Sequence, residues 1–455
     1  MLLHATDDLC AWDKLEDCPT LTTIRDFLQT VPDQPLIDGL VAARGRGRDD
    51  FPVARLWHVV LLTIALRHVY FNALLAELHR NPALCRLIDI HHEDEIPDAH
   101  NLSRFLDVLG QEPHLSALRD IFNVLVQRLG LAIPELGQHT AGDATALSGR
   151  AKKDAQAVAA EVEQGLPQPS GGRKEYKDDE GRVTKVVEWF GYKLHLLVDV
   201  KHEVTLAYNI TDTKVGDNEQ VPALVEQACA NLPAQRLKTL AYDKAADDEK
   251  VHDCLHTHGI KPLIQNRALW QSEAERVLGG RYPLHLVHDE SGTISCYDTI
   301  SDPPVRHKMS YVGYEKDRET VRYRCPAQHE GWECPSDAKC NEDRSYGLTV
   351  RIPCTEDLRR FPPIPRATLE FERLYKGRTA VERINARLKI FWGADDGNVT
   401  GSRRFHAQVG VVLIVHLVFA TLLAQAPRWE GTLGQTRLGP IAAALRQPEP
   451  ELVAS

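Results

Sequence analysis

Residues 375–389 read YKGRTAVERINARLK, with Tyr375, Arg378, Glu382 and Lys389 three, four and seven residues apart. At about 100° per residue of an α-helix, these four side chains fall within one narrow stripe. One carboxylate therefore lies among two cations and a phenol. The pattern fits an ordinary solvated helix with an i, i+4 ion pair, or a carboxylate that binds a metal ion while the cations hold a polyanion. The stretch alone leaves both interpretations open.

Composition limits where a polyanion can bind. The 455 residues are 43% hydrophobic and 26% charged, which is typical of a globular protein with two or three domains. The net charge of −10 argues against a protein that coats nucleic acid over its whole surface. Residues 358–406 nevertheless contain eleven basic and five acidic residues. A nucleic-acid site is therefore expected to be local and to surround the quoted stretch.

Several features bear on location and redox state. The start of the chain, MLLHATDDLCAWDK, has no basic segment followed by an apolar run, so we expect no signal peptide and a cytoplasmic location. Residues 409–424 are apolar but shorter than the roughly 18 residues of a membrane span, so we expect a buried helix and no membrane partner. Six of the ten cysteines are spread singly and are expected to be buried thiols: Cys10, Cys18, Cys85, Cys229, Cys254 and Cys296.

The first 267 residues divide into two parts. Residues 1–135 read as an all-helical N-terminal domain, in which residues 56–79 have apolar positions at helical spacing. Residues 136–267 read as a strand, a hairpin, a helix, a strand, a helix and a strand, interrupted by a charged and mobile excursion at 151–179. This order describes an α/β layer with a mixed sheet flanked by helices.

The remaining chain completes this layer after an interruption. Residues 268–369 contain short β-like runs divided by polar turns, and we expect a β-rich insertion. Residues 370–425 supply the last helices of the layer, and residues 426–455 read as a loosely ordered tail.

Two acidic residues interrupt apolar strands of the layer. Asp143 lies in GDAT on the first strand, and Asp243 ends the strand RLKTLAYD, where ligands of open α/β sheets gather. An acid there is costly unless it is paired, hydrogen-bonded or metal-bound, although a turn or helix cap remains the alternative for each. With Glu382 they would form an all-oxygen site suited to two Mg²⁺ or Mn²⁺ ions, which support in-line displacement at phosphorus.

On these residues the chain resembles the DDE transposases of bacterial insertion sequences, in the group with a Tyr-x2-Arg-x3-Glu-x6-Lys signature. The quoted stretch matches that signature in full, and Asp143, Asp243 and Glu382 resemble the family's three acids. The resemblance covers about residues 140–265 and 370–425. The N-terminal helical region resembles, less specifically, an end-binding domain. Ala245 and Ala246 depart from the pattern, since many relatives have Gly and an aromatic residue there.

The resemblance implies an RNase H-like fold with a β-rich insertion before the last catalytic helix. It implies binding of the element's inverted-repeat ends, cleavage, and transfer of 3′ ends into target DNA, with the three acids as ligands of two Mg²⁺ or Mn²⁺ ions. Tyr375, Arg378 and Lys389 would contact the double-stranded DNA, and pairing of two ends implies a homo-oligomer on DNA. Two alternatives stay open: an RNase H-like nuclease without strand transfer, and a non-catalytic DNA-binding descendant of a transposase.

The insertion contains a second candidate site. Cys325, Cys334, Cys340 and Cys354 are separated by eight, five and thirteen residues. Four thiolates can close a structural zinc site, but no Cys-x2-Cys pair is present. Zinc and reduced thiols therefore both remain open.

Overall fold

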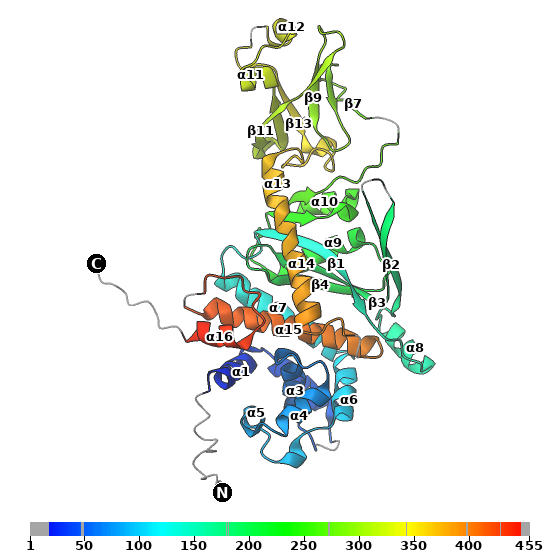
Figure 1. Cartoon of the computed structure of the whole chain (residues 1–455), viewed down its shortest axis with the longest axis vertical. Coiled ribbons are helices and arrows are strands. Elements are labelled where there is room, and N and C mark those ends of the chain that lie inside the picture. The colour runs from blue at the N-terminus through cyan, green and yellow to red at the C-terminus, as the bar shows by residue number, and fades with distance from the viewer. Residues whose placement is uncertain are drawn as a thin grey trace, which may run out of the picture.

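The computed structural model describes residues 18–46, 50–178, 180, 182–271, 274–342, 344–396, 399–427 and 429–446. Its three parts follow one another along the longest axis, with the N-terminal helices at one end, the α/β layer in the middle and the insertion at the other end (Figure 1). The start of the chain, for which we expected no signal peptide, lies outside the described residues.

The N-terminal region is helical, as expected. Its elements are α1 (Pro19–Thr30), α2 (Gln34–Arg44), α3 (Val53–Ala65), α4 (Phe71–Leu78), α5 (Pro82–Leu87), η3 (Glu93–Glu95), α6 (Ala99–Leu109) and α7 (His114–Ala132). The helical run at 56–79 is divided between α3 and α4, because Arg67 adopts a left-handed φ of 65°. The amides of Arg67 and His68 donate back to Ile64 and Thr63, which is a Schellman ending.

The α/β layer is a mixed sheet flanked by helices, which confirms the predicted arrangement. Its strands are β1 (His139–Ser148), β2 (Ser170–Lys177), β3 (Val183–Asp199), β4 (Thr205–Thr211), β5 (Thr239–Tyr242) and β6 (Lys261–Ile264), followed or separated by α9 (Asp217–Asn231) and α10 (Glu249–Thr257). The sheet has the order β2-β3-β1-β5-β6, and β4 also pairs with β3. β1, β2 and β4 run antiparallel to β3, whereas β5 is parallel to β1 and β6 to β5.

The excursion at 151–179 differs from the mobile segment that we expected. It contains α8 (Ala155–Glu163), whose first amides are capped by Asp154, and the strand β2. β2 pairs with the first half of β3, while β1 and β4 pair with its second half. The length of β3 explains why this segment forms a strand, because the first half of β3 presents backbone N–H and C=O groups that need partners.

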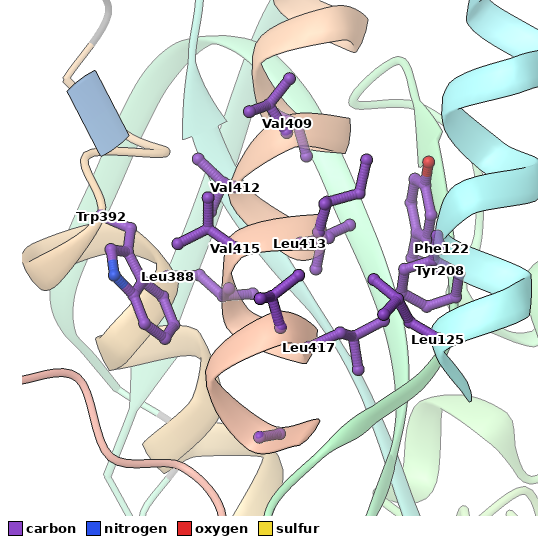
Figure 2. Close-up of a cluster of buried hydrophobic side chains, with 14 of the residues drawn as sticks. Phe122, Leu125, Tyr208, Leu388, Trp392, Val409, Val412, Leu413, Val415 and Leu417 are labelled. Atoms are coloured by element: carbon purple, nitrogen blue, oxygen red, sulfur yellow. The ribbon is translucent and has the colours of Figure 1, made fainter. Parts of the chain in front are cut away.

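The core of the molecule forms around α15 (Ser402–Gln425). This helix is long and apolar enough to cross a membrane, but 89% of its apolar window is buried inside the molecule. Figure 2 shows Val412, Leu413 and Leu417 of α15 between Leu388 and Trp392 on one side and side chains of α7 and β4 on the other. A helix that is hydrophobic all round must be buried in this way.

One hydrophobic cluster joins the N-terminal helices, the sheet and α15, so the predicted N-terminal domain shares its core with the layer. After α15, the structure has α16 (Leu438–Leu445) where we expected a loosely ordered tail. α16 packs against α1 and α15, and Ile441 is fully buried. The end of that tail, residues 447–455, lies outside the described residues.

The insertion is β-rich, as predicted, and has a separate hydrophobic cluster. One sheet has the order β10-β9-β8-β7 and the other β11-β12-β13. Its elements are β7 (Arg276–Val277), β8 (Leu286–His288), β9 (Ile294–Asp298), β10 (Val305–Lys308), β11 (Ser310–Glu315), β12 (Thr320–Arg324), α11 (Pro326–Glu330), α12 (Asp337–Asn341) and β13 (Thr349–Pro353).

Candidate active site

The signature stretch crosses the sheet as four successive helical segments. α13 (Leu369–Tyr375) is followed by the 3₁₀ turn η7 (Lys376–Arg378), by α14 (Thr379–Ala386) and by the π turn η8 (Arg387–Phe391). α13 starts below the insertion and α14 continues towards α15 (Figure 1). Because 3₁₀ and π turns have fewer or more residues per turn than an α-helix, the single stripe that we expected does not extend to Lys389.

Two aspartates lie side by side at the edge that this helix crosses. In the parallel pairing of β1 with β5, Ala141 lies opposite Ala241. Asp143 and Asp243 each follow this pair by two residues, and they are close enough for the charge of Asp243 to raise the pKa of Asp143. Asp243 also caps the 3₁₀ turn that follows it, since its carboxylate accepts a hydrogen bond of 2.9 Å from the Ala245 amide. The cap that we considered as an alternative is therefore present together with the paired arrangement.

Arg378 joins the signature helix to these acids. Its Nη2 donates a 2.6 Å hydrogen bond to Oε1 of Glu382, and its Nη1 lies 3.8 Å from Oδ2 of Asp143. The i, i+4 ion pair expected for an ordinary solvated helix thus exists, and Arg378 also brings it against β1 of the sheet. Tyr375 belongs to the same group, because its phenol is close enough to Arg378 and Asp243 for their charges to change its pKa. Burial raises this pKa, Arg378 lowers it and Asp243 raises it further.

The electrostatics of this group favour a bound cation. Burial raises the pKa of Asp143 to about 6, and the negative charge of Asp243 adds to the effect, although the Ala144 amide and Arg378 oppose it. Neighbouring carboxylates with a raised pKa mark a candidate functional site, and here one of them already lies against Arg378. Oxygen ligands of this kind suit Mg²⁺ or Mn²⁺.

Glu382, the third acid, does not form a metal-binding group with Asp143 and Asp243 in the structure. Among the described residues, no group of three or more His, Cys, Asp or Glu side chains is arranged to hold a metal ion. Glu382 is directed to Arg378, and its side chain is 51% exposed. Asp143 and Glu382 both lie against Arg378, so a metal ion shared by the three acids would require Arg378 to move away.

Lys389 lies apart from this group. Its ammonium donates a 2.7 Å hydrogen bond to the carbonyl of Ala146 and lies 2.9 Å from Oδ2 of Asp395. Asp395 in turn accepts a hydrogen bond from the amide of Ser148. Lys389 therefore ties the π turn to the end of β1.

Most basic residues of the stretch 358–406 likewise form ion pairs or hydrogen bonds within the protein. Arg383 and Arg387, for example, both pair with the buried carboxylate of Glu203 in the β3–β4 turn. Arg373 and Lys376 are exposed beside Tyr375 and make no ion pair in the described part of the chain. Our sequence reasoning did not single them out, although both lie within or next to the quoted stretch.

Asp247 is a second acid in the motif AYDKAAD, but its environment is structural. Its carboxylate is fully buried and lies 2.8 Å from Nη2 of Arg359, 3.4 Å from Nη2 of Arg366 and 3.1 Å from Nε2 of His252. It also accepts a 2.7 Å hydrogen bond from the Arg267 amide. Both carboxylate oxygens of Asp247 are bonded to these partners, so Asp247 is not available to the acidic group. Asp243 is therefore the acid of this motif that faces the site.

Gly142 is required because the ring of Tyr242 lies against its backbone. A Cβ atom at Gly142 would lie 2.4 Å from Cε2 of Tyr242, a fully buried side chain next to Asp243. We expect Gly142→Ala to destabilise the fold by about 1–3 kcal/mol and to lower activity, because the displaced ring moves Asp243. Urea unfolding of this variant and of Gly171→Ala, where a Cβ meets open space, checks the prediction. Equal stability of the two variants would contradict it.

The cysteines of the insertion gather differently from the predicted set. Cys325, Cys334 and Cys340 line one small cavity together with Cys296. Cys354 lies outside it, at the end of β13, where burial raises the pKa of its thiol to about 12. The fourth cysteine at this cavity is therefore Cys296, which we had expected to be an isolated thiol, and not Cys354.

With the site described, the chain can be compared with known proteins. The structure combines a mixed α/β layer with two neighbouring aspartates and a helical segment that carries Arg378 and Glu382. Residues 137–418 match the family model of the transposase DDE domain, and the chain belongs to this family. It is therefore a transposase.

Among solved structures, the chain is similar to the piggyBac transposase in a synaptic complex with hairpin DNA. The two chains share 8% sequence identity, the similarity covers 94% of this chain and 80% of that chain, and the TM-score is 0.37. No curated protein matches the chain.

Proposed function

We propose that the chain is the DNA transposase of a bacterial insertion sequence, which binds the inverted-repeat ends, cleaves phosphodiester bonds and transfers 3′ ends into target DNA. The observation that carries this proposal is the proximity of Asp143 to Asp243 and to Arg378, which in turn pairs with Glu382. All four residues lie within the matched transposase domain. The antiparallel pairing of β4 with β3 and of β3 with β1, followed by the parallel strands β5 and β6, supports an RNase H-like fold.

Asp143, Asp243 and Glu382 are the residues that would hold two Mg²⁺ or Mn²⁺ ions. When bound, such ions activate an attacking oxygen and stabilise a leaving one in an in-line displacement at phosphorus. Arg378 neutralises Asp143 and Glu382 in the structure as it stands. It is placed to turn from Glu382 to a phosphate of the substrate, which would free the third carboxylate.

Tyr375 and Arg378 are proposed to contact the double-stranded DNA near the scissile phosphate, and the exposed Arg373 and Lys376 extend this surface. Phosphate contacts of this kind position the duplex without reading its sequence. Lys389, also expected at the DNA, is proposed to act by fixing the π turn against β1, since its ammonium is already bonded there. We further propose that the protein works in the cytoplasm as a homo-oligomer that pairs two element ends.

The proposal is tested with a DNA fragment that carries the flanking sequence of the gene, incubated with purified protein and either Mg²⁺ or EDTA. A transposase gives cuts at the repeat ends with Mg²⁺ only, followed by joining of 3′ ends to a target plasmid. Cutting without joined products would instead indicate the RNase H-like nuclease. Binding of the ends without cutting would indicate the non-catalytic descendant.

The raised pKa of Asp143 predicts how metal binding depends on pH. Only the carboxylate form binds a divalent ion, and the pKa of about 6 means that this form is lost as the pH falls through 6. The dissociation constant for Mn²⁺ is therefore expected to rise about tenfold per pH unit below pH 6 and to be nearly constant above pH 7. Titration with Mn²⁺ followed by electron paramagnetic resonance measures this. A dissociation constant that changes by less than about twofold between pH 5 and 7 would contradict the prediction.

A further inference from the structure

Four cysteines from separate segments of the insertion converge on one small cavity. Cys296 comes from β9, Cys325 from the start of α11, Cys334 from the loop after α11 and Cys340 from α12. The cavity has a volume of about 20 Å³, which is enough for one water molecule or one ion. Of the nine cysteines in the described residues, all are free thiols, so no disulfide explains the convergence.

We propose that Cys296, Cys325, Cys334 and Cys340 form a structural zinc site of the insertion. Four cysteine thiolates are a usual ligand set of a closed, tetrahedral Zn²⁺ site. The site is independent of the proposed function and of the acidic group, whose neighbours in the chain Ala141, Tyr242 and Val381 belong to the other hydrophobic cluster.

The thiols around the cavity are neutral in the absence of a metal ion. Burial raises the pKa of the Cys296 thiol to about 12, and the neighbouring Cys325, Cys334 and Cys340 add to the effect. Burial also raises the pKa values of Cys334 and Cys340. Without a cation the thiols are therefore neutral, whereas Zn²⁺ deprotonates its cysteine ligands and removes their mutual repulsion.

Groups around the thiols supply the hydrogen bonds that a thiolate site needs. Nδ2 of Asn341 donates to Sγ of Cys325 at 3.6 Å, and the Ser336 amide donates to the thiol of Cys334. Nε2 of His285 lies 3.7 Å from Sγ of Cys340. Such outer contacts orient ligands and stabilise their negative charge.

The thiols surround the cavity without closing on one point, since no three of the described His, Cys, Asp or Glu side chains are arranged to hold a metal ion. Neutral thiols keep van der Waals separations, whereas thiolates approach Zn²⁺ to about 2.3 Å. Cys334 and Cys340 lie in a loop and in a five-residue helix, which are the parts able to adjust. Binding therefore draws α12 towards β9.

The insertion has a physical reason to use a metal. Its hydrophobic cluster holds twelve buried residues, and α11 and α12 have five residues each. Helices of this length are unstable by themselves, and small cores commonly depend on a metal or disulfides. A zinc ion would join β9, α11 and α12 into one unit.

The test measures zinc in full-length protein purified under reducing conditions, for the wild type, Cys296→Ser and Cys354→Ser. Cys354 is the matched control, because it is a buried thiol of the same insertion outside the cavity. We expect about one zinc per chain in the wild type and in Cys354→Ser, and a loss of about tenfold or more in Cys296→Ser. Less than about one zinc per ten wild-type chains, or equal loss in both variants, would overturn the proposal.

A second measurement covers the case in which Cys296→Ser does not fold. Cobalt replaces zinc in the wild type and in Cys340→His, a variant that keeps a ligand at this position. Four thiolates predict intense sulfur-to-cobalt absorption in the wild type, which falls by about a quarter in Cys340→His while cobalt stays bound. An octahedral, weakly absorbing cobalt spectrum in the wild type would overturn the proposal.

Discussion

Asp143→Asn and Asp243→Asn are each expected to lower DNA cleavage by about 10³-fold or more while DNA binding and the fold are kept. The amide has the shape of the carboxylate but not the negative charge that a divalent ion requires. Asp143 supplies that charge at a largely buried position, where water cannot easily take its place as a ligand. Glu382→Gln is expected to have a comparable effect, since this acid is the third proposed ligand. Cleavage of end-containing DNA with Mg²⁺ measures all three variants.

The matched control is Glu372→Gln. Glu372 is an exposed acid of α13, in the same helical run as Glu382, but no observation places it in the acidic group. It is expected to retain wild-type cleavage within about twofold. Wild-type cleavage by Asp143→Asn or Asp243→Asn would remove that residue from the site, and wild-type cleavage by Glu382→Gln would leave the aspartate pair as the whole acidic set.

Asp247→Ala is expected to destabilise the protein by about 3–5 kcal/mol, because it leaves buried cations without their counter-charge. Arg359 and Arg366 are 13% and 8% exposed, and both depend on this carboxylate. They belong to the segment that returns from the insertion, so this junction is expected to unfold first. Urea unfolding of Asp247→Ala measures the change, and Asp253→Asn, an exposed acid on α10, is the control. A loss below about 1 kcal/mol would show that the network is dispensable.

The pH dependence of this network has a definite sign. Although burial raises the pKa of Asp247, hydrogen bonds from His252 and Arg359 lower it to about 2. Because this folded-state pKa lies below the unfolded value of about 3.9, the carboxylate stabilises the fold fully above pH 4. That contribution is lost as the pH falls towards 2. The stability difference between wild type and Asp247→Ala is therefore expected to shrink between pH 4 and pH 2.

Sequence reasoning located the mixed sheet and the two aspartates because both depend on local patterns. An acid within or directly after an apolar strand is recognisable from the strand itself, and the structure brings Asp143 close enough to Asp243 for their charges to interact. The prediction for Lys389 depended on an uninterrupted α-helix. The turns η7 and η8 break that assumption, and Lys389 bonds to Ala146 and Asp395 instead.

Two further differences have a common cause. Cys296 precedes Cys325 by 28 intervening residues, and only the packing of β9 against the segment that holds α11 and α12 brings them to one cavity. The excursion at 151–179 has a polar sequence, yet it forms β2 because the long strand β3 presents unpaired backbone groups. In both cases the partner is distant in the chain.

The sequence by itself therefore determined most of the helices and strands, the acids within and after apolar strands, and the resemblance to transposases, since all of these depend on local patterns of residue type and spacing. The tertiary structure alone decided which charges are available. It committed Asp247, Arg383, Arg387 and Lys389 to internal ion pairs, and it brought Asp143 close to both Asp243 and Arg378. Charge compensation depends on distance in space, and the fold sets that distance between residues up to hundreds of positions apart.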